Sequence, residues 1–249
     1  MTFVVARGAR FHLVDLGAGA NGGAHRPVVM LHGLFTGSAA SWYFTAAPAI
    51  ARHHPVRLID WRGHGLSERT PTGYDSAGMV QDLEELTADL PSFAVTGHSW
   101  GAVVAVRFAL AHPGRVLRLA LVDPPFAQIR KHTPGGDRVP EGALELTKLL
   151  GAPTPGTQVL LERTTVLTDL ACEPQVTETE LCGLAGIPLL AVIGSRSPFR
   201  PAADLIIRAL PDARCHILGG GHDLHISAKA RLTPLLADFL GASDGSDDG

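Results

Sequence analysis

Short runs of apolar residues alternate along the chain with longer stretches that have helical periodicity. Six runs are rich in Val, Ile and Leu and lack strict alternation of polar and apolar positions, as expected for strands covered on both faces. They are Val28–Leu31, Val56–Ile59, Phe93–Thr96, Leu117–Val122, Leu189–Ile193 and Cys215–Leu218. A hairpin is expected before them, over residues 3–16. This pattern predicts an α/β fold with a mostly parallel central sheet and crossover helices.

Five segments between the strands have the spacing of amphipathic helices, and they are expected to cover both faces of the sheet. They are Ser38–Arg52, Ser76–Leu90, Trp100–Ala111, Ala202–Leu210 and Leu224–Leu240.

The region 124–186 interrupts this alternation. It opens with Pro124-Pro125 and contains two helical patterns, Glu141–Leu150 and Thr157–Cys172. Because it is too long for a simple crossover, we predict a helical lid inserted after strand six into a core of residues 1–123 and 187–242. An ordinary pair of extra crossover helices is the alternative. Residues 243–249 have no apolar anchor and are expected to form a disordered tail.

The composition fits one soluble globular domain, with 45% apolar and 18% charged residues in a chain of 249. A net charge of −3 gives no field that would recruit nucleic acid or an anionic membrane, so a small-molecule substrate is the expected partner. Three cysteines are too few for a disulfide framework, and neither a signal peptide nor an apolar run of spanning length is visible. We therefore expect a cytoplasmic protein. No metal cluster, phosphate loop or dinucleotide motif is present, so we expect no cofactor and no metal.

The strongest candidate for chemistry is the sequence Thr96-Gly97-His98-Ser99-Trp100-Gly101-Ala102, which follows a predicted strand and precedes a predicted helix. It is a G-x-S-x-G pattern in the strand–turn–helix context that this pattern requires. Glycines at 97 and 101 remove side chains that would collide in so sharp a turn, which leaves Ser99 exposed at the carboxyl edge of the sheet as a candidate nucleophile. The helix start directs the Trp100 N–H and the positive end of the helix dipole at an oxyanion formed beside Ser99.

Further motifs in register with the predicted elements make the chain resemble the α/β-hydrolase superfamily over nearly its full length. They are His32-Gly33-Leu34-Phe35 after a strand, Asp60 through Ser67 after the next strand, and Gly221-His222 after the last strand. The resemblance implies an α/β-hydrolase fold of the serine-nucleophile branch. Ser99 excludes the superfamily's haloalkane dehalogenases and epoxide hydrolases, which have Asp at that turn.

The resemblance also implies an oxyanion hole and several structural residues. Its donors would be the backbone N–H groups of Leu34 and Trp100, with the Phe35 N–H as the weaker choice for the first. His32 is expected to be a hydrogen-bonded turn residue. The stretch Asp60 through Ser67 is expected to fix a loop beneath the site, so that His64 is not counted as a base.

His222 is the candidate general base. It follows Gly219-Gly220-Gly221, a run without side chains that would let the imidazole approach the nucleophile turn. His225, three residues on, is the nearest competitor.

A histidine base needs a carboxylate to orient it, and the superfamily usually supplies that acid shortly after the seventh strand. Ser197 stands at this position and cannot carry the charge. Asp123, at the end of the preceding strand, is the substitute, as in some thioesterase domains and lipases of the superfamily. The alternative is that Asp123 only accepts turn hydrogen bonds ahead of two prolines.

Three functions are compatible with these residues. The first is hydrolysis of an ester, thioester or lactone through a Ser99–His222–Asp123 triad and an acyl-enzyme. The second is a non-hydrolytic member of the fold, such as a cofactor-independent dioxygenase, lyase, cyclase or epimerase, with the His–Asp pair as base. The third is a catalytically silent binding module, against which the intact motifs argue. Substrate contacts are expected from Phe35 and Phe126, and more weakly from Ile129, Leu144, Leu149, Leu160 and Val166.

Overall fold

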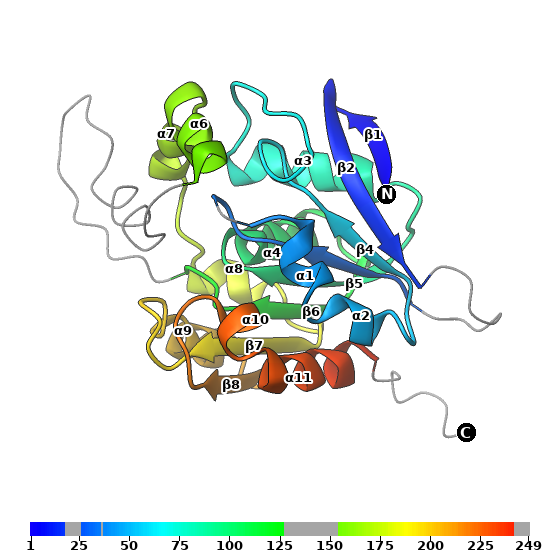
Figure 1. Ribbon diagram of the computed structural model, residues 1–249. Coiled ribbons are helices and arrows are strands. Elements are labelled where there is room, and N and C mark those ends of the chain that lie inside the picture. Colours follow the sequence, from blue (N-terminus) through cyan, green and yellow to red (C-terminus); the bar gives the residue numbers. More distant parts are fainter. Residues whose placement is uncertain (18–25, 36, 127–153, 242–249) are drawn as a thin grey trace, which may run out of the picture.

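One eight-stranded sheet organises the computed structural model, which describes residues 1–17, 26–35, 37–126 and 154–241 (Figure 1). The strand order is β1-β2-β4-β3-β5-β6-β7-β8. The strands are β1 (Thr2–Ala6), β2 (Ala9–Leu16), β3 (Val28–Leu31), β4 (Val56–Ile59), β5 (Phe93–His98), β6 (Val116–Val122), β7 (Leu189–Gly194) and β8 (Arg214–Leu218).

The sheet is parallel from β4 through β8, and only the N-terminal hairpin runs antiparallel. Strands β1 and β2 form that hairpin, and β2 pairs antiparallel with β4. The hairpin, the six later strands and the mostly parallel sheet confirm the prediction from the sequence. Parallel strands bring their carboxyl ends to one edge, which is where the candidate motifs lie.

Helices cover both faces of the sheet, because alternate residues of each central strand point to opposite sides. Val29 and Leu31 of β3 join a cluster with α3 (Ser76–Leu86), α4 (Trp100–Ala111) and α9 (Ala202–Ala209). Val28 and Met30 join a cluster on the other face with α1 (Ala39–Tyr43), α2 (Ala47–Ile50) and α11 (Lys229–Gly241).

Two helices predicted as continuous are each divided in two. The segment Ser38–Arg52 forms α1 and α2, because the Thr45 hydroxyl donates to the Ser41 carbonyl at 2.5 Å and Pro48, which has no N–H, falls in the first turn of α2. The segment Leu224–Leu240 forms α10 (Leu224–Ser227) and α11, since Ala228 leaves the helical region at φ −125°.

Helix α3 ends at Leu86, four residues before the predicted end. The Thr87 hydroxyl donates to the Leu83 carbonyl at 2.6 Å, and Arg115 donates to the carbonyls of Thr87 and Leu90. These side chains thus bond to carbonyls at the end of the helix and in the non-helical segment that follows it.

The inserted region contributes α6 (Pro155–Arg163), α7 (Val166–Cys172) and α8 (Glu178–Cys182) to the described part of the chain. The predicted helix Thr157–Cys172 is interrupted at Thr164, whose backbone is extended at φ −135° and ψ 168°. Leu160 and Val166 are fully buried in the same cluster as α3 and α4, so α6 and α7 pack on the core. The predicted helix Glu141–Leu150 and the predicted tail lie outside the described residues.

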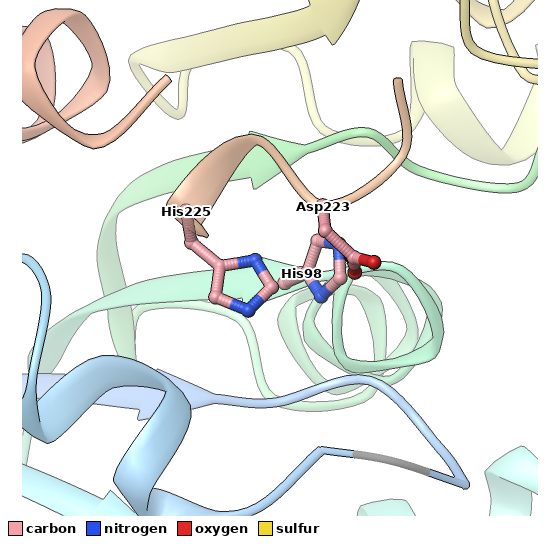
Figure 2. Close-up of side chains that lie close together, drawn as sticks. All are labelled: His98, Asp223 and His225. Carbon is pink, nitrogen blue, oxygen red and sulfur yellow. Dashed lines mark ion pairs between the residues drawn. The ribbon is translucent and has the colours of Figure 1, made fainter. Parts of the chain in front are cut away.

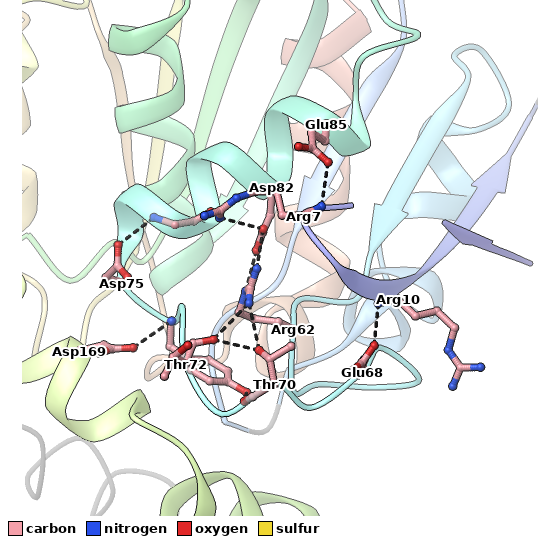
Figure 3. A network of polar contacts seen from close by, with 12 residues as sticks. Arg7, Arg10, Arg62, Glu68, Thr70, Thr72, Asp75, Asp82, Glu85 and Asp169 are labelled. Carbon is pink, nitrogen blue, oxygen red and sulfur yellow. Dashed lines mark hydrogen bonds and ion pairs between the residues drawn. The ribbon is translucent and has the colours of Figure 1, made fainter. Parts of the chain in front are cut away.

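A polar network ties the loop after β4 to α3 and to the hairpin (Figure 3). Arg62 donates to both carboxylate oxygens of the fully buried Asp82, at 2.7 and 2.6 Å, and Arg7 donates to the same carboxylate at 3.1 Å. Asp169 of α7 accepts the backbone N–H of Tyr74 at 3.0 Å, which extends the network into the inserted region.

In the described part of the chain, no helix combines the length and the apolar character needed to cross a membrane. All three cysteines, Cys172, Cys182 and Cys215, are free thiols.

Candidate active site

Ser99 occupies a strained turn between the end of β5 and the start of α4. Its backbone has φ 52° and ψ −122°, a region that non-glycine residues rarely adopt. A Cβ at Gly97 would lie 2.3 Å from the Gly101 carbonyl oxygen, and a Cβ at Gly101 would lie 2.7 Å from the Leu31 carbonyl oxygen. Both glycines are therefore required by the close approach of backbone to backbone.

The loop after β3 runs directly against Ser99. A Cβ at Gly33 would lie 2.9 Å from the Ser99 Cβ and 3.4 Å from its Oγ. The next two residues provide the candidate oxyanion donors. The Phe35 N–H donates to His64 Nε2 at 2.8 Å, so it is already occupied. Among the residues that the structure describes, the N–H groups of Leu34 and Trp100 have no hydrogen-bond partner.

His32 and His64 are structural in their hydrogen bonding. His32 donates from Nδ1 to the Gly33 carbonyl at 2.7 Å and accepts from the Trp61 N–H at 3.0 Å. His64 donates from Nδ1 to the Arg62 carbonyl at 2.8 Å. Burial lowers the pKa of His32 to about 4 and the pKa of His64 to about 3, so both rings are neutral at pH 7.

Asp60 stabilises the loop after β4, which runs from Asp60 to Ser67. Its carboxylate accepts the Ala39 N–H at 2.6 Å, the Leu66 N–H at 3.0 Å and the His12 ring at 2.7 Å. The loop from Asp60 to Ser67 is thus fixed by its own carboxylate, in the supporting position expected from the sequence.

Asp123 and His222 form a direct hydrogen bond, with His222 Nδ1 donating to Asp123 Oδ2 at 2.6 Å. Asp123 is completely buried at the end of β6, with a positive φ of 48°. Its other oxygen, Oδ1, accepts the Gly194 N–H at 2.8 Å. The Asp123 carboxylate therefore faces the imidazole rather than serving only the turn before Pro124.

Ser197 occupies the superfamily's usual position of the acid and contacts the carboxylate of the candidate acid, Asp123. Its hydroxyl donates to Asp123 Oδ2 at 2.5 Å, the same oxygen that binds His222. Ser197 also accepts the Phe199 N–H at 3.1 Å, and the Phe199 ring packs edge-on against His222 with 5.0 Å between centroids.

The glycine run before His222 lies against Gly194 of β7, and within the run a Cβ at Gly220 would lie 2.8 Å from Leu224 Cδ2. A Cβ at Gly194 would lie 2.3 Å from the Gly221 carbonyl oxygen, whereas a Cβ at Gly221 or Gly219 would meet little or nothing. Gly194 of β7 therefore makes room for the backbone of the His222 loop.

His98 is a site residue that the sequence reasoning missed. His98 Nε2 donates to the His222 carbonyl at 3.1 Å, and the two rings lie 4.7 Å apart. This bond joins the base loop to the residue next to Ser99. Burial lowers the pKa of His98 well below its usual value, and the neighbouring His225 and His222 lower it further. It occupies a variable position of the G-x-S-x-G pattern, which gives no signal for its role.

His225, the competing base, lies apart from the carboxylate. It is 4% exposed and packs against Trp42 and His98, with ring centroids 5.6 and 4.4 Å away. Burial lowers its pKa below the usual value. The bond between His222 and Asp123 makes His222 the better candidate.

The two aromatic residues expected at the substrate pocket differ in exposure. Phe35 is half-buried, and its positive φ of 71° turns the loop beside Ser99. Phe126 is 2% exposed and packs in the larger hydrophobic cluster. Ile129, Leu144 and Leu149 lie outside the described residues.

Comparison with known proteins agrees with this architecture. The family model described as alpha/beta hydrolase fold matches residues 26–178. The chain belongs to this family. The match spans the candidate nucleophile turn, the loop after β3 and the end of β6.

Curated relatives are similar over part of their length. A soluble epoxide hydrolase of Corynebacterium sp. (strain C12) is 38% identical over 120 residues, which cover 47% of this chain and 38% of that protein. An sn-1-specific diacylglycerol lipase of Danio rerio is 39% identical over 105 residues, 41% of this chain and 32% of that protein. The chain thus matches well under half the length of these relatives.

Solved structures match nearly the whole chain at low identity. An enol-lactonase from Burkholderia xenovorans LB400 has a TM-score of 0.76 at 21% identity, covering 97% of this chain and 100% of that one. An esterase from Exiguobacterium antarcticum has the same TM-score and identity, covering 97% of this chain and 99% of that one. These likenesses show the fold.

Proposed function

We propose that the protein is a serine hydrolase that cleaves a carboxylic ester, thioester or lactone of a small, mainly apolar substrate. Ser99 is the nucleophile, His222 the general base and Asp123 the acid of the triad. The observation that carries the proposal is the 2.6 Å hydrogen bond from His222 to Asp123, on a loop bonded through His98 to the Ser99 turn.

In the first half of the proposed reaction, His222 accepts the Ser99 proton as the oxygen attacks the substrate carbonyl. The resulting imidazolium is stabilised by the Asp123 carboxylate, whose hydrogen bond to Nδ1 also fixes the tautomer with a free Nε2. His222 then protonates the leaving group, and an acyl-enzyme on Ser99 remains.

The oxyanion of each tetrahedral intermediate binds the free N–H groups of Leu34 and Trp100. The second of these lies at the positive end of the α4 dipole, which adds to the stabilisation. Water activated by His222 then releases the acyl group. Preorganised backbone donors of this kind are each worth about 10²- to 10³-fold in rate.

The names of similar proteins support acyl chemistry without fixing the substrate. They include a lactonase, an esterase, a thioesterase domain and a lipase, and each of these names denotes an enzyme class that cleaves an acyl bond. The epoxide hydrolase in this set does not carry over to the proposal, because Ser99 stands where that activity is expected to need a carboxylate.

We further propose that α6 and α7 form part of a cover over the site, within a lid of residues 124–186. Thr157 of α6 donates to the Phe35 carbonyl at 3.3 Å, and Leu160 lies so close to Gly63 that a Cβ there would be 2.7 Å from its Cδ1. These contacts seat α6 on the loops that flank the candidate oxyanion donors.

Labelling with a serine-directed fluorophosphonate tests the nucleophile. We expect one label per chain at Ser99 in the parent and none in Ser99→Ala. Hydrolysis of a panel of short p-nitrophenyl esters should likewise be lost in Ser99→Ala. Ser195→Ala, an exposed serine near the site, is the matched control and should retain both.

A parent protein that takes up no label and hydrolyses no ester, thioester or lactone would contradict the proposal. Turnover that survives Ser99→Ala while depending on His222 would instead favour a non-hydrolytic reaction with the His–Asp pair as base.

A further inference from the structure

Three side chains with metal-binding groups lie close together next to the candidate base His222. His98 lies at the end of β5, Asp223 directly follows His222, and His225 lies in α10 (Figure 2). One ring nitrogen from each histidine and one carboxylate oxygen lie within 4.8 Å of one another. His98 Nε2 faces Asp223, with 4.0 Å between Nε2 and Oδ1.

His225 gives an independent indication of a ligand. His225 is 4% exposed, and in the described part of the chain its Nδ1 is buried without a hydrogen-bond partner. Buried polar atoms are almost always paired, so an unpaired one requires an explanation. The Asp223 side chain is 59% exposed, which leaves the cluster open to solvent on that side and lets the carboxylate move.

We propose that His98, Asp223 and His225 bind one first-row transition-metal ion, of which Zn²⁺ is the representative. Two imidazoles and a carboxylate are a ligand set that such ions favour, and water would complete a tetrahedron. With bonds of about 2.0–2.2 Å, the ligand atoms must approach one another more closely than 4.8 Å. The exposed Asp223 side chain can move to bring its carboxylate oxygen closer to the two histidines.

Binding at His98 would alter its bond to the base loop. Nε2 now carries the proton that it donates to the His222 carbonyl. To coordinate an ion through Nε2, His98 must move this proton to Nδ1, and the bond to His222 is then lost. The site thus exists in two exclusive states, one anchoring the loop and one holding the ion.

The ion is therefore an inhibitor and not a cofactor, a consequence that rests on the proposed role of His222. Loss of this bond removes a contact that positions the candidate base, whose ring centroid lies only 4.7 Å from that of His98.

Metal binding is measured on the full chain without reference to activity. Co²⁺ is titrated while its visible absorption is recorded, and Zn²⁺ is titrated by calorimetry. We expect one ion per chain in the parent and an affinity at least about 10-fold weaker in Asp223→Asn. His225→Phe, which keeps a ring in the buried position, should abolish binding, whereas His216→Gln, an exposed histidine, should not change it.

The inhibition arm uses ester hydrolysis with and without Zn²⁺. Zn²⁺ should inhibit the parent reversibly, with recovery on chelation, and should inhibit Asp223→Asn only at concentrations at least about 10-fold higher. Absence of Co²⁺ binding, or equal binding in the parent and Asp223→Asn, would overturn the site. Metal binding in a protein without hydrolase activity would leave the site intact and overturn the proposed function instead.

Discussion

Asp123 receives three hydrogen bonds in a completely buried position, from His222, Ser197 and the Gly194 N–H. Three donors replace hydrogen bonds that the carboxylate would make to water if it were exposed. Two of these donors come from the segment that begins at the end of β7. The residue at the superfamily's usual acid position thus helps to support the candidate acid on β6.

Asp123→Asn should lower kcat by about 10⁴-fold while the fold remains intact, because an amide neither fixes the His222 tautomer nor stabilises its charge. Steady-state kinetics and circular dichroism measure the two effects. Ser197→Ala, the control, removes one neutral donor and should cost less than about 10-fold. Equal and mild losses in both variants would reject Asp123 as the acid.

The double variant Asp123→Asn with Ser197→Asp should recover part of the lost activity. The hydroxyl of Ser197 reaches the oxygen that binds His222, so a carboxylate at residue 197 approaches the same ring nitrogen. We expect a kcat at least about 10-fold above that of Asp123→Asn alone. No gain at all would show that residue 197 cannot reach His222.

The buried histidines His32 and His64 should make the protein sensitive to mild acid. Their folded pKa values, about 4 and about 3, lie below the unfolded value of 6.5, so protons bind preferentially to the unfolded chain. Their stabilising contribution is complete above pH 6.5 and declines as the pH falls toward 4. Between pH 7.5 and pH 5 the loss is on the order of 2 kcal/mol for each.

Urea unfolding at these two pH values measures the loss. His32→Asn should reduce the dependence on pH, and the exposed His53→Gln should leave it unchanged. A midpoint independent of pH in the parent would contradict this account.

At the scale of elements, the site depends on backbone segments that touch without side chains between them. Gly33 against Ser99 and Gly194 against Gly221 are two examples at the carboxyl edge. Side-chain chemistry is thus positioned by contacts between loops, and small changes in these contacts should alter catalysis before they alter folding.

Gly194→Ala tests that dependence. The added Cβ would lie 2.3 Å from the Gly221 carbonyl oxygen, so the backbone next to His222 must shift. We expect kcat to fall by at least about 100-fold, as expected when a catalytic group is displaced by about 1 Å. Gly219→Ala, in the same loop, meets no atom closer than 3.8 Å and should retain activity. Comparable losses in both variants would contradict the proposed contact.

The limits of strands were easier to predict than the limits of helices, because different interactions determine where each kind of element ends. A buried strand is a continuous apolar run, so its limits are visible in the sequence. Helix limits here depend on tertiary contacts. Arg115, far along the chain, helps to end α3 at Leu86, and the hydroxyls of Thr45 and Thr164 bond to carbonyls where α1 and α6 end.

At the scale of the whole molecule, the buried Arg62–Asp82 pair joins parts that are distant in sequence. It connects the loop after β4, helix α3 and, through Arg7, the N-terminal hairpin (Figure 3). The loop that begins at Asp60 also carries His64, which holds the Phe35 N–H beside the candidate oxyanion donors. Stability and site geometry therefore share this network.

Asp82→Asn should lower the free energy of unfolding by about 3–5 kcal/mol, because it leaves the buried Arg62 charge without its carboxylate. Chemical denaturation at pH 7 measures this loss. Asp204→Asn breaks an exposed ion pair with Arg200 and is the control, with an expected loss below about 1 kcal/mol. A loss for Asp82→Asn no larger than the control would show that water reaches the pair.

Most residues of the candidate site could be predicted from the order of the motifs along the chain. Each motif follows a strand, and the parallel strands of the sheet end at the same edge. The carboxylate on β6 could be inferred only because Ser197 cannot be the acid. His98 could not be inferred at all, since its role arises from a carbonyl more than 100 positions away that only the folded chain brings near.

In the proposed triad the acid lies on β6, so the segment that begins at Gly194 need not supply a charged group. That segment supplies one amide and one hydroxyl, and neither carries charge. We therefore expect the exposed residues 195 and 196 to tolerate substitution without loss of turnover, which makes this turn a place where related chains can diverge in sequence.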